Sequence, residues 1–200
     1  MGQYWKIVNI DRCEHLGHWG KLGEFFEAHD SLDIILLLAD SWAGCRIMCL
    51  GDYMIKCPPN VLTSEELAEI EKLPENTETE RGKTLYSLAT EHYKHVSNRI
   101  RWGDLRGMVL RNRTKRVYVR RDEVLEALAG REGDIGNVLL TNISWSDDPS
   151  CAMRLDLSRG AWAGDRLDVV PLNVVETNEE WEDVTEDQVK LTRFALSRND

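Results

Sequence analysis

The apolar residues of this chain come in short runs, and their spacing switches irregularly between the helical and the strand period. The longest run extends only from Ile34 to Ala39, whereas a bilayer-spanning helix needs about 20 apolar residues, so we expect no membrane association. Helices are predicted at 19–28, 32–39, 63–73, 84–97, 123–129 and from 185 onward. Strands are predicted at 3–10, 47–50, 108–110, 117–119, 135–145 and 166–170. Because these segments lack the regular alternation of a doubly wound protein, they predict an α+β fold, with helices packed on a mixed or antiparallel sheet.

The length of 200 residues predicts a single domain, 1–200, with the halves 1–98 and 99–200 as the alternative division. The formal net charge of −10 argues against nucleic acid as a partner of the whole protein. Five cysteines are irregularly spaced, which is typical of reduced thiols and predicts a cytoplasmic protein. The sequence does not predict the oligomeric state.

One motif occurs twice, at 42–47 and at 162–167: Trp-Ala-Gly-x-Arg followed by an aliphatic residue. The glycine of each copy permits a backbone conformation with positive φ, and the arginine begins an apolar run. The motif therefore predicts a turn that leads into a strand, with the tryptophan able to stack on the guanidinium group.

This repeat has two interpretations. In the first, the copies are structural corners in the halves of a pseudo-two-fold sheet, because tryptophan and glycine at strand entries usually serve packing. In the second, the two copies form a shared cleft in which Arg46 and Arg166 hold an anionic ligand. The residue types favour packing.

Several segments together carry a resemblance to a known family. They are residues 2–9, 19–24, 42–47, 51–53, 144–150 and 159–166. In these segments the chain resembles a family of uncharacterised proteins that is abundant in mushroom-forming fungi and has more distant relatives in bacteria and phages. The resemblance implies a fungal-type intracellular protein and no particular activity. The family pattern tends to place Asp before the first motif arginine, where this chain has Cys45, so no catalytic acid is expected there.

The spacing of potential ligands predicts no metal site and no cofactor. Among the cysteines, only Cys45 and Cys49 have the spacing of a zinc-ligand pair. On a strand, these two residues would share a face but lie about 13 Å apart, too far for one ion. No phosphate-binding loop, dinucleotide fingerprint or nucleophile elbow is present in the sequence.

Carboxylates follow two of the apolar segments. Asp148 lies just beyond Trp145, and Asp52 and Tyr53 close the strand of the first motif. Paired carboxylates at a strand end can act as acid and base or bind a cation. They are also common in turns, because Asp side chains accept hydrogen bonds from their own backbone, and this second interpretation is favoured.

Charge is strongly segregated along the chain. The segment 99–121 contains nine basic residues and one acidic residue, a net charge of +8, which leaves −18 for the remainder. This basic segment could bind the phosphates of RNA. Alternatively, it pairs with the acidic stretches 65–80 and 176–187, and the acidic composition of the whole chain favours pairing.

The sequence does not establish a function, and three hypotheses follow from these features. The first is an intracellular binding module whose Trp- and Arg-lined cleft takes a small anionic ligand or a protein partner. The second is a small hydrolase or lyase that uses aspartates as acid or base, and the third is RNA binding through the segment 99–121. The candidate ligand-binding residues are Trp42, Arg46, Asp52, Tyr53, Trp145, Asp148, Trp162, Asp165 and Arg166.

Overall fold

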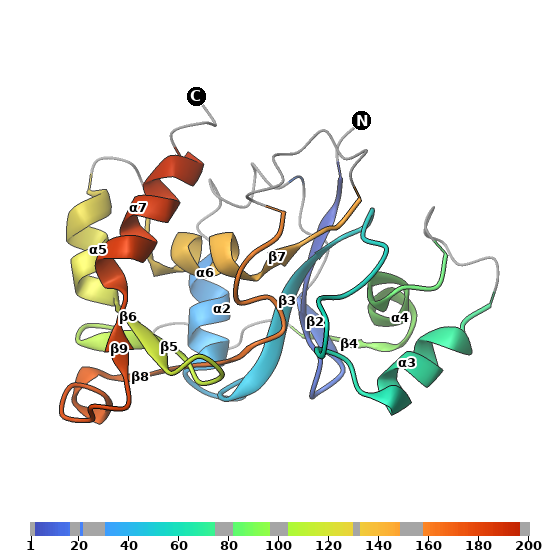
Figure 1. The fold of residues 1–200 in the computed structure, drawn as a ribbon, viewed down its shortest axis with the longest axis horizontal. Helices are drawn as coiled ribbons and strands as arrows, with labels where there is room; N and C mark the ends of the chain where they lie inside the picture. The colour runs from blue at the N-terminus through green and yellow to red at the C-terminus, as the bar shows by residue number, and fades with distance from the viewer. Residues whose placement is uncertain are drawn as a thin grey trace. The chain divides into compact units, whose positions relative to one another are not determined.

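The computed structural model describes residues 3–16, 21, 31–74, 82–96, 104–129, 133–148 and 158–196. Within these ranges, six α-helices accompany nine strands that pair in both parallel and antiparallel fashion (Figure 1). The predicted α+β class with a mixed sheet is therefore confirmed. The chain divides into two compact units, of which unit 1 comprises 1–22, 47–97 and 142–164, and unit 2 comprises 23–46, 98–141 and 165–200. That the chain acts as a single domain stays a prediction.

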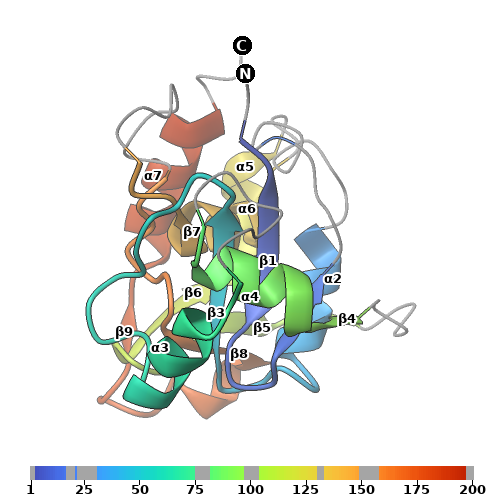
Figure 2. The same cartoon turned by 90° about the vertical axis from the view of Figure 1, so that its right-hand side faces the viewer.

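Unit 1 is built on short strands. They are β1 (Trp5–Asn9), β2 (Glu14–Leu16), β3 (Cys45–Gly51) from residue 47 onward, β4 (Lys94–Val96) and β7 (Ser144–Trp145). β1 pairs antiparallel with β2 and β3, whereas β4 runs parallel to β2 and β7 runs parallel to β3. Figure 2 shows this unit with its helices α3 (Ser64–Glu71) and α4 (Leu85–His92) in front of the strands.

The core of unit 1 lies between these helices and the strands. Val8 and Leu50 from the sheet pack in one cluster with Ile70 of α3 and Leu85 of α4. α3 begins as predicted, because the Thr63 hydroxyl accepts from the amide of Glu66 and the Glu66 carboxylate accepts from the amide of Thr63. α4 ends at His92, earlier than predicted, and β4 follows it.

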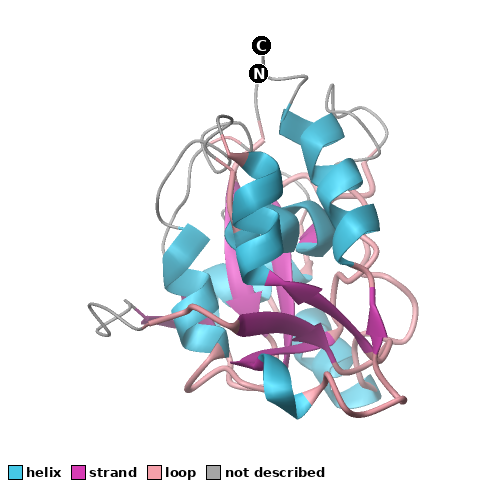
Figure 3. Cartoon of the chain, turned by 90° about the vertical axis from the view of Figure 1, so that its left-hand side faces the viewer, coloured by secondary structure: helices cyan, strands magenta, loops and turns pink. Residues whose placement is uncertain are grey.

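Unit 2 contains the remaining elements. They are α2 (Ser31–Leu38), β5 (Met108–Asn112), β6 (Val117–Arg120), α5 (Arg121–Leu128), α6 (Ile135–Ile143) up to residue 141, β8 (Arg166–Pro171), a 3-10 helix (Leu172–Val174), β9 (Glu182–Asp183) and α7 (Thr185–Leu196). β5 and β6 form the predicted hairpin, β8 pairs antiparallel with β5, and β9 runs parallel to β6. α5 and α7 lie side by side and pack on β6 (Figure 3).

One strand prediction is wrong. Residues 135–145 form the helix α6 followed by the two-residue strand β7, not one long strand. Every residue from 135 to 144 is buried, so the apolar run suits a buried helix as well as a buried strand. Asp134 also accepts from the amides of residues 136 and 137 at 2.7 and 3.3 Å, which caps the start of the helix.

The helix predicted at 19–28 lies, apart from residue 21, outside the described residues. The helix predicted at 32–39, the strand at 47–50 and the helix from 185 are each observed within one or two residues of their expected ends. Of the described helices, none could cross a membrane, since even α7 has only 12 residues.

Candidate functional site

In unit 2 the two arginines of the repeated motif lie directly opposite each other. β3 pairs antiparallel with β8, with Arg46 opposite Arg166, and the amide of Gly44 donates to the carbonyl of Leu167 at 2.7 Å. Residues directly opposite in a ladder project from the same face of a sheet. The structure therefore brings Arg46 and Arg166 together although 120 residues separate them in the sequence.

Both copies of the motif turn into a strand as predicted. The φ angles of Gly44 and Gly164 are +74° and +82°, values that side-chain-bearing residues rarely adopt. In unit 1, the amide of Gly164 donates to the carbonyl of Ile47 at 2.9 Å, the same bond that Gly44 makes to Leu167 in unit 2. A pseudo-two-fold relation between larger parts of the chain stays a prediction.

A third arginine joins the first two from the turn between β5 and β6. The amide of Arg113 donates to the carbonyl of Arg166 at 2.8 Å, and the amide of Arg166 donates to the Thr114 hydroxyl at 2.9 Å. Because Arg111 is opposite Asp168 in the β5–β8 ladder, Arg113 comes opposite Arg166 two residues further on. We call Arg46, Arg166 and Arg113, which neighbour one another across the strands, the arginine row.

Two guanidinium groups of the arginine row lie against Gly44. Arg166 Nη1 donates to the carbonyl oxygen of Gly44 at 3.0 Å. A Cβ atom at Gly44 would overlap Nη1 of Arg113, so the absence of a side chain there is what admits this guanidinium group. The side chain of Arg113 is 51% exposed, and Arg166 is exposed as well. The row therefore presents positive charge to solvent.

Two aspartates lie beside the arginine row. Asp168, whose side chain is 5% exposed, accepts a two-pronged interaction from Arg111 at 2.8 Å for each bond, and Arg113 Nε lies 3.8 Å from it. Asp165 accepts from the Asn112 amide at 2.8 Å and from Lys115 at 3.3 Å. Together with the arginine row, these contacts gather five cations, from Arg46, Arg111, Arg113, Lys115 and Arg166, and two carboxylates.

Trp181 belongs to the same region of unit 2 and is not among the predicted site residues. The guanidinium carbon of Arg111 lies 4.6 Å from the centre of the Trp181 ring, within the range of a cation–π contact. Trp181 packs with Val109, Tyr118 and Val175 in a small cluster. In the sequence, its only signal is an aromatic residue within an acidic stretch. The Trp181 ring and the Asp168 carboxylate hold the guanidinium group of Arg111 in place, so the main role of Arg111 is structural.

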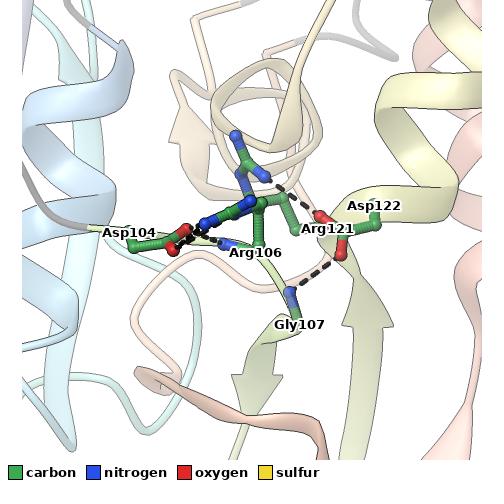
Figure 4. Close-up of polar contacts among 5 residues, drawn as sticks. All are labelled: Asp104, Arg106, Gly107, Arg121 and Asp122. Carbon is green, nitrogen blue, oxygen red and sulfur yellow. Dashed lines mark hydrogen bonds and ion pairs between the residues drawn. The ribbon is translucent and has the colours of Figure 1, made fainter.

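The rest of the described basic segment is paired with carboxylates. Figure 4 shows that Arg106 donates hydrogen bonds to the carboxylate of Asp104. In the same view, Arg121 and the amide of Gly107 each donate a hydrogen bond to one oxygen of Asp122. Hydrogen bonds from Arg106 lower the pKa of the Asp104 carboxyl to about 2. The predicted pairing with the stretch 176–187 is also observed, since Arg116 lies 3.9 Å from Glu180 and Arg120 lies 2.6 Å from Asp183.

The pKa of the Asp183 carboxyl reflects its pairing with Arg120. Burial raises the pKa of its carboxyl, but the hydrogen bonds from Thr185 and the charge of Arg120 outweigh that effect and hold the pKa below its usual value. A hydrogen bond with Tyr118 and the Asp183 charge raise the pKa of Arg120. These carboxylates compete with phosphates for the same cations, which argues against the RNA-binding hypothesis.

The tryptophans of the motif are core residues. Trp42 in unit 2 is fully buried, and Trp162 in unit 1 is 3% exposed. Their burial favours the packing interpretation for the tryptophans, while the arginines of the same motif reach the surface or lie half-buried. A cleft lined by both residue types stays a prediction.

The other predicted site residues of unit 1 stabilise loops. The carboxylate of Asp52 accepts from the amide of Tyr4 at 3.0 Å, and the indole N–H of Trp145 donates to the carbonyl of Lys56 at 2.7 Å. Tyr53 is half-buried and Asp148 is 4% exposed. Of the predicted aspartates, Asp165 alone lies in unit 2 with the two motif arginines. A role for Asp52 or Asp148 in acid–base chemistry stays a prediction.

The cysteines at 13, 45, 49 and 57 are free thiols. Within the described ranges, no three His, Cys, Asp or Glu side chains gather closely enough to hold a metal ion.

Comparisons with protein-family models, with curated proteins and with solved structures find no match. The resemblance to the fungal family therefore stays a prediction.

Proposed function

We propose that unit 2 is a binding module for a small molecule that carries a phosphate or carboxylate group, held by the arginine row. The observation that carries the proposal is that Arg46 and Arg166 lie opposite each other on adjacent strands and Arg113 joins them from the β5–β6 turn, with two of the three guanidinium groups against Gly44. Guanidinium groups present paired N–H donors that match the oxygens of phosphate and carboxylate.

The energetics of the sheet support this proposal. Like charges directly opposite each other destabilise an antiparallel pair, whereas most opposite-charge or apolar pairs stabilise it. An anion bound across the row would convert this repulsion into attraction.

The enzyme hypothesis is weaker on the same geometry. Asp165 is the aspartate nearest the row in sequence, and its carboxylate already accepts from Asn112 and Lys115. An acid or base needs access to substrate, and the side chain of Asp165 is only 14% exposed. We therefore prefer binding to catalysis. The proposal includes a cytoplasmic location, which suits the four free thiols of the described residues.

Removal of single charges from the row tests the proposal. We expect Arg166→Gln and Arg113→Gln to weaken the binding of inorganic phosphate or pyrophosphate by roughly 10- to 100-fold, since a hydrogen bond to a charged group contributes about 1.5–3 kcal/mol. Arg116→Gln is the matched control, because Arg116 lies in the same hairpin turn, is 64% exposed and pairs with Glu180 outside the row. Isothermal titration calorimetry at low salt measures each affinity.

Equal losses in all three variants would mean that general charge, and not the row, attracts the anion. No binding of phosphate, pyrophosphate or citrate by the wild-type protein at millimolar concentration would refute the proposal. Urea denaturation of each variant shows whether a lost affinity reflects a lost fold.

A further inference from the structure

Unit 1 contains a pocket that the sequence does not predict. It has a volume of about 450 Å³, within the range of roughly 300–1,000 Å³ typical of small-molecule sites. The loop 54–62 forms one wall, and α3 together with the start of α4 forms the other. All of its lining residues belong to unit 1.

The lining of this pocket is mainly apolar. Met54, Ile70 and Leu85 lie in the core cluster of unit 1, so the pocket reaches the core. Ile55 and Leu67 also line it and are 48% and 51% exposed, so both walls present aliphatic surface to solvent at the pocket. A ligand with an apolar body would cover this surface and remove it from water.

The wall formed by the loop is held in place by contacts outside the pocket. The carboxylate of Asp147 accepts from the amides of Ile55 and Lys56, at 2.6 and 3.1 Å. The indole of Trp145 donates to the carbonyl of Lys56 at 2.7 Å. Because both backbone groups of Lys56 are engaged, the loop is fixed before a ligand arrives, which lowers the entropic cost of binding.

The charges near the pocket balance closely. Its charged lining residues are Lys56, Lys83 and Glu71, and Lys83 Nζ donates to the backbone carbonyl of Glu71 at 2.9 Å. Asp147 and Glu66, which do not line the pocket, act on the Cys57 thiol inside it. Burial, with these two carboxylates, raises the pKa of that thiol to about 12, so it remains uncharged at neutral pH.

We infer that this pocket binds an uncharged, mainly apolar small molecule. Two ammonium groups and three carboxylates on or near the pocket give neither sign a clear excess. A charged ligand would have to give up hydration in a pocket whose lining is mainly apolar and whose charges nearly balance, whereas a neutral ligand would not. This site lies in unit 1 and is independent of the arginine row.

Three probes of equal length test the inference: 1-octanol, octanoate and octylammonium, titrated into the full-length protein and followed by calorimetry and heteronuclear NMR. We expect octanol to bind with one-to-one stoichiometry and at least tenfold more tightly than either ion. Leu67→Glu should abolish octanol binding, because it places a charge in the apolar wall at a position that is already half exposed. Leu191→Glu on α7, where the leucine is 37% exposed, is the matched control and should bind octanol as the wild type does.

Ile55→Glu provides a second variant on the opposite wall, and the amide spectrum of each variant confirms that it is folded. The inference is overturned if octanol fails to bind up to its solubility limit, or if a folded Leu67→Glu variant still binds it. Tighter binding of octanoate or octylammonium would overturn the neutral-ligand assignment. Phosphate binding in unit 2 is measured separately, so failure of either proposal leaves the other intact.

Discussion

Replacement of Gly44 by alanine probes the arginine row and the backbone that supports it. The φ angle of Gly44 is +74°, and alanine in this region costs about 1–2 kcal/mol. The new Cβ would also occupy the position of Arg113 Nη1. Arg113 is long, flexible and 51% exposed, so its guanidinium group can move away at little further cost to stability. We therefore expect Gly44→Ala to lower the free energy of unfolding by about 1–2 kcal/mol and to displace Arg113 from the row.

Gly107→Ala separates these two effects. Gly107 has a similar φ angle of +67°, also lies in unit 2, and a Cβ there would meet no atom within 4 Å. The hydrogen bond from the backbone amide of Gly107 to the Asp122 carboxylate, drawn in Figure 4, does not involve the Cβ position. This variant should show the same loss of stability as Gly44→Ala, with no displacement of an arginine.

The assay pairs urea denaturation with phosphate titration for both variants. We expect equal losses of stability, with phosphate affinity reduced about tenfold in Gly44→Ala alone, the effect of losing one charge-assisted interaction. Unchanged phosphate affinity in Gly44→Ala would refute the placement of Arg113 in the binding site. A much larger loss of stability in Gly44→Ala than in Gly107→Ala would show that Arg113 cannot move as argued.

Two further predictions concern the cores of the two units. Asp168→Asn should lower the free energy of unfolding by roughly 3–5 kcal/mol in urea denaturation, because it leaves the largely buried Arg111 without its carboxylate partner. Asp104→Asn, at an exposed ion pair, is the control and should change the free energy of unfolding little. A larger loss of stability in Asp104→Asn than in Asp168→Asn would refute the argument. Burial lowers the pKa of Lys6 from 10.5 to about 8. Between these two values the folded state has already released the Lys6 proton, whereas the unfolded state still holds it. The free energy of unfolding should therefore rise as the pH increases from about 8 toward 10.5, by at most about 3 kcal/mol. Lys6→Met should be more stable than the wild type at pH 7.5 and should lose this dependence; a wild-type stability that falls between pH 8 and 9.5 would contradict the assignment.

Local signals in the sequence predicted many of the elements. The capping box of Thr63 and Glu66 located the start of α3, because its two hydrogen bonds form between residues three apart. The β5–β6 hairpin was predicted for a similar reason, since a short turn brings its strands together. By contrast, the segment 135–145 was misassigned because a run rich in Ile, Val and Leu suits a buried strand as well as a buried helix. The capping residue Asp134 was the signal that could have decided between them.

The candidate site was predictable only in part. The repeated motif identified Arg46 and Arg166, and the structure places them opposite each other. Arg113 could not be singled out among the cations of the basic segment, because its position depends on the register between β5 and β8, which are far apart in the sequence. The pocket of unit 1 was not predicted for the same reason: its walls come from a loop and two helices that only tertiary packing brings together.

The repeated motif combines a structural and a functional role, and the two can be separated by residue type. Trp42 and Trp162 are buried, so the aromatic half of the motif stabilises the fold whatever the arginines do. Arg46 and Arg166 lie directly opposite each other in the β3–β8 ladder, and like charges in that position repel each other. A sheet selected for stability alone would hold an apolar or oppositely charged pair at this position. Under the proposed function, an oxyanion bound across Arg46 and Arg166 would offset the repulsion between these two like charges.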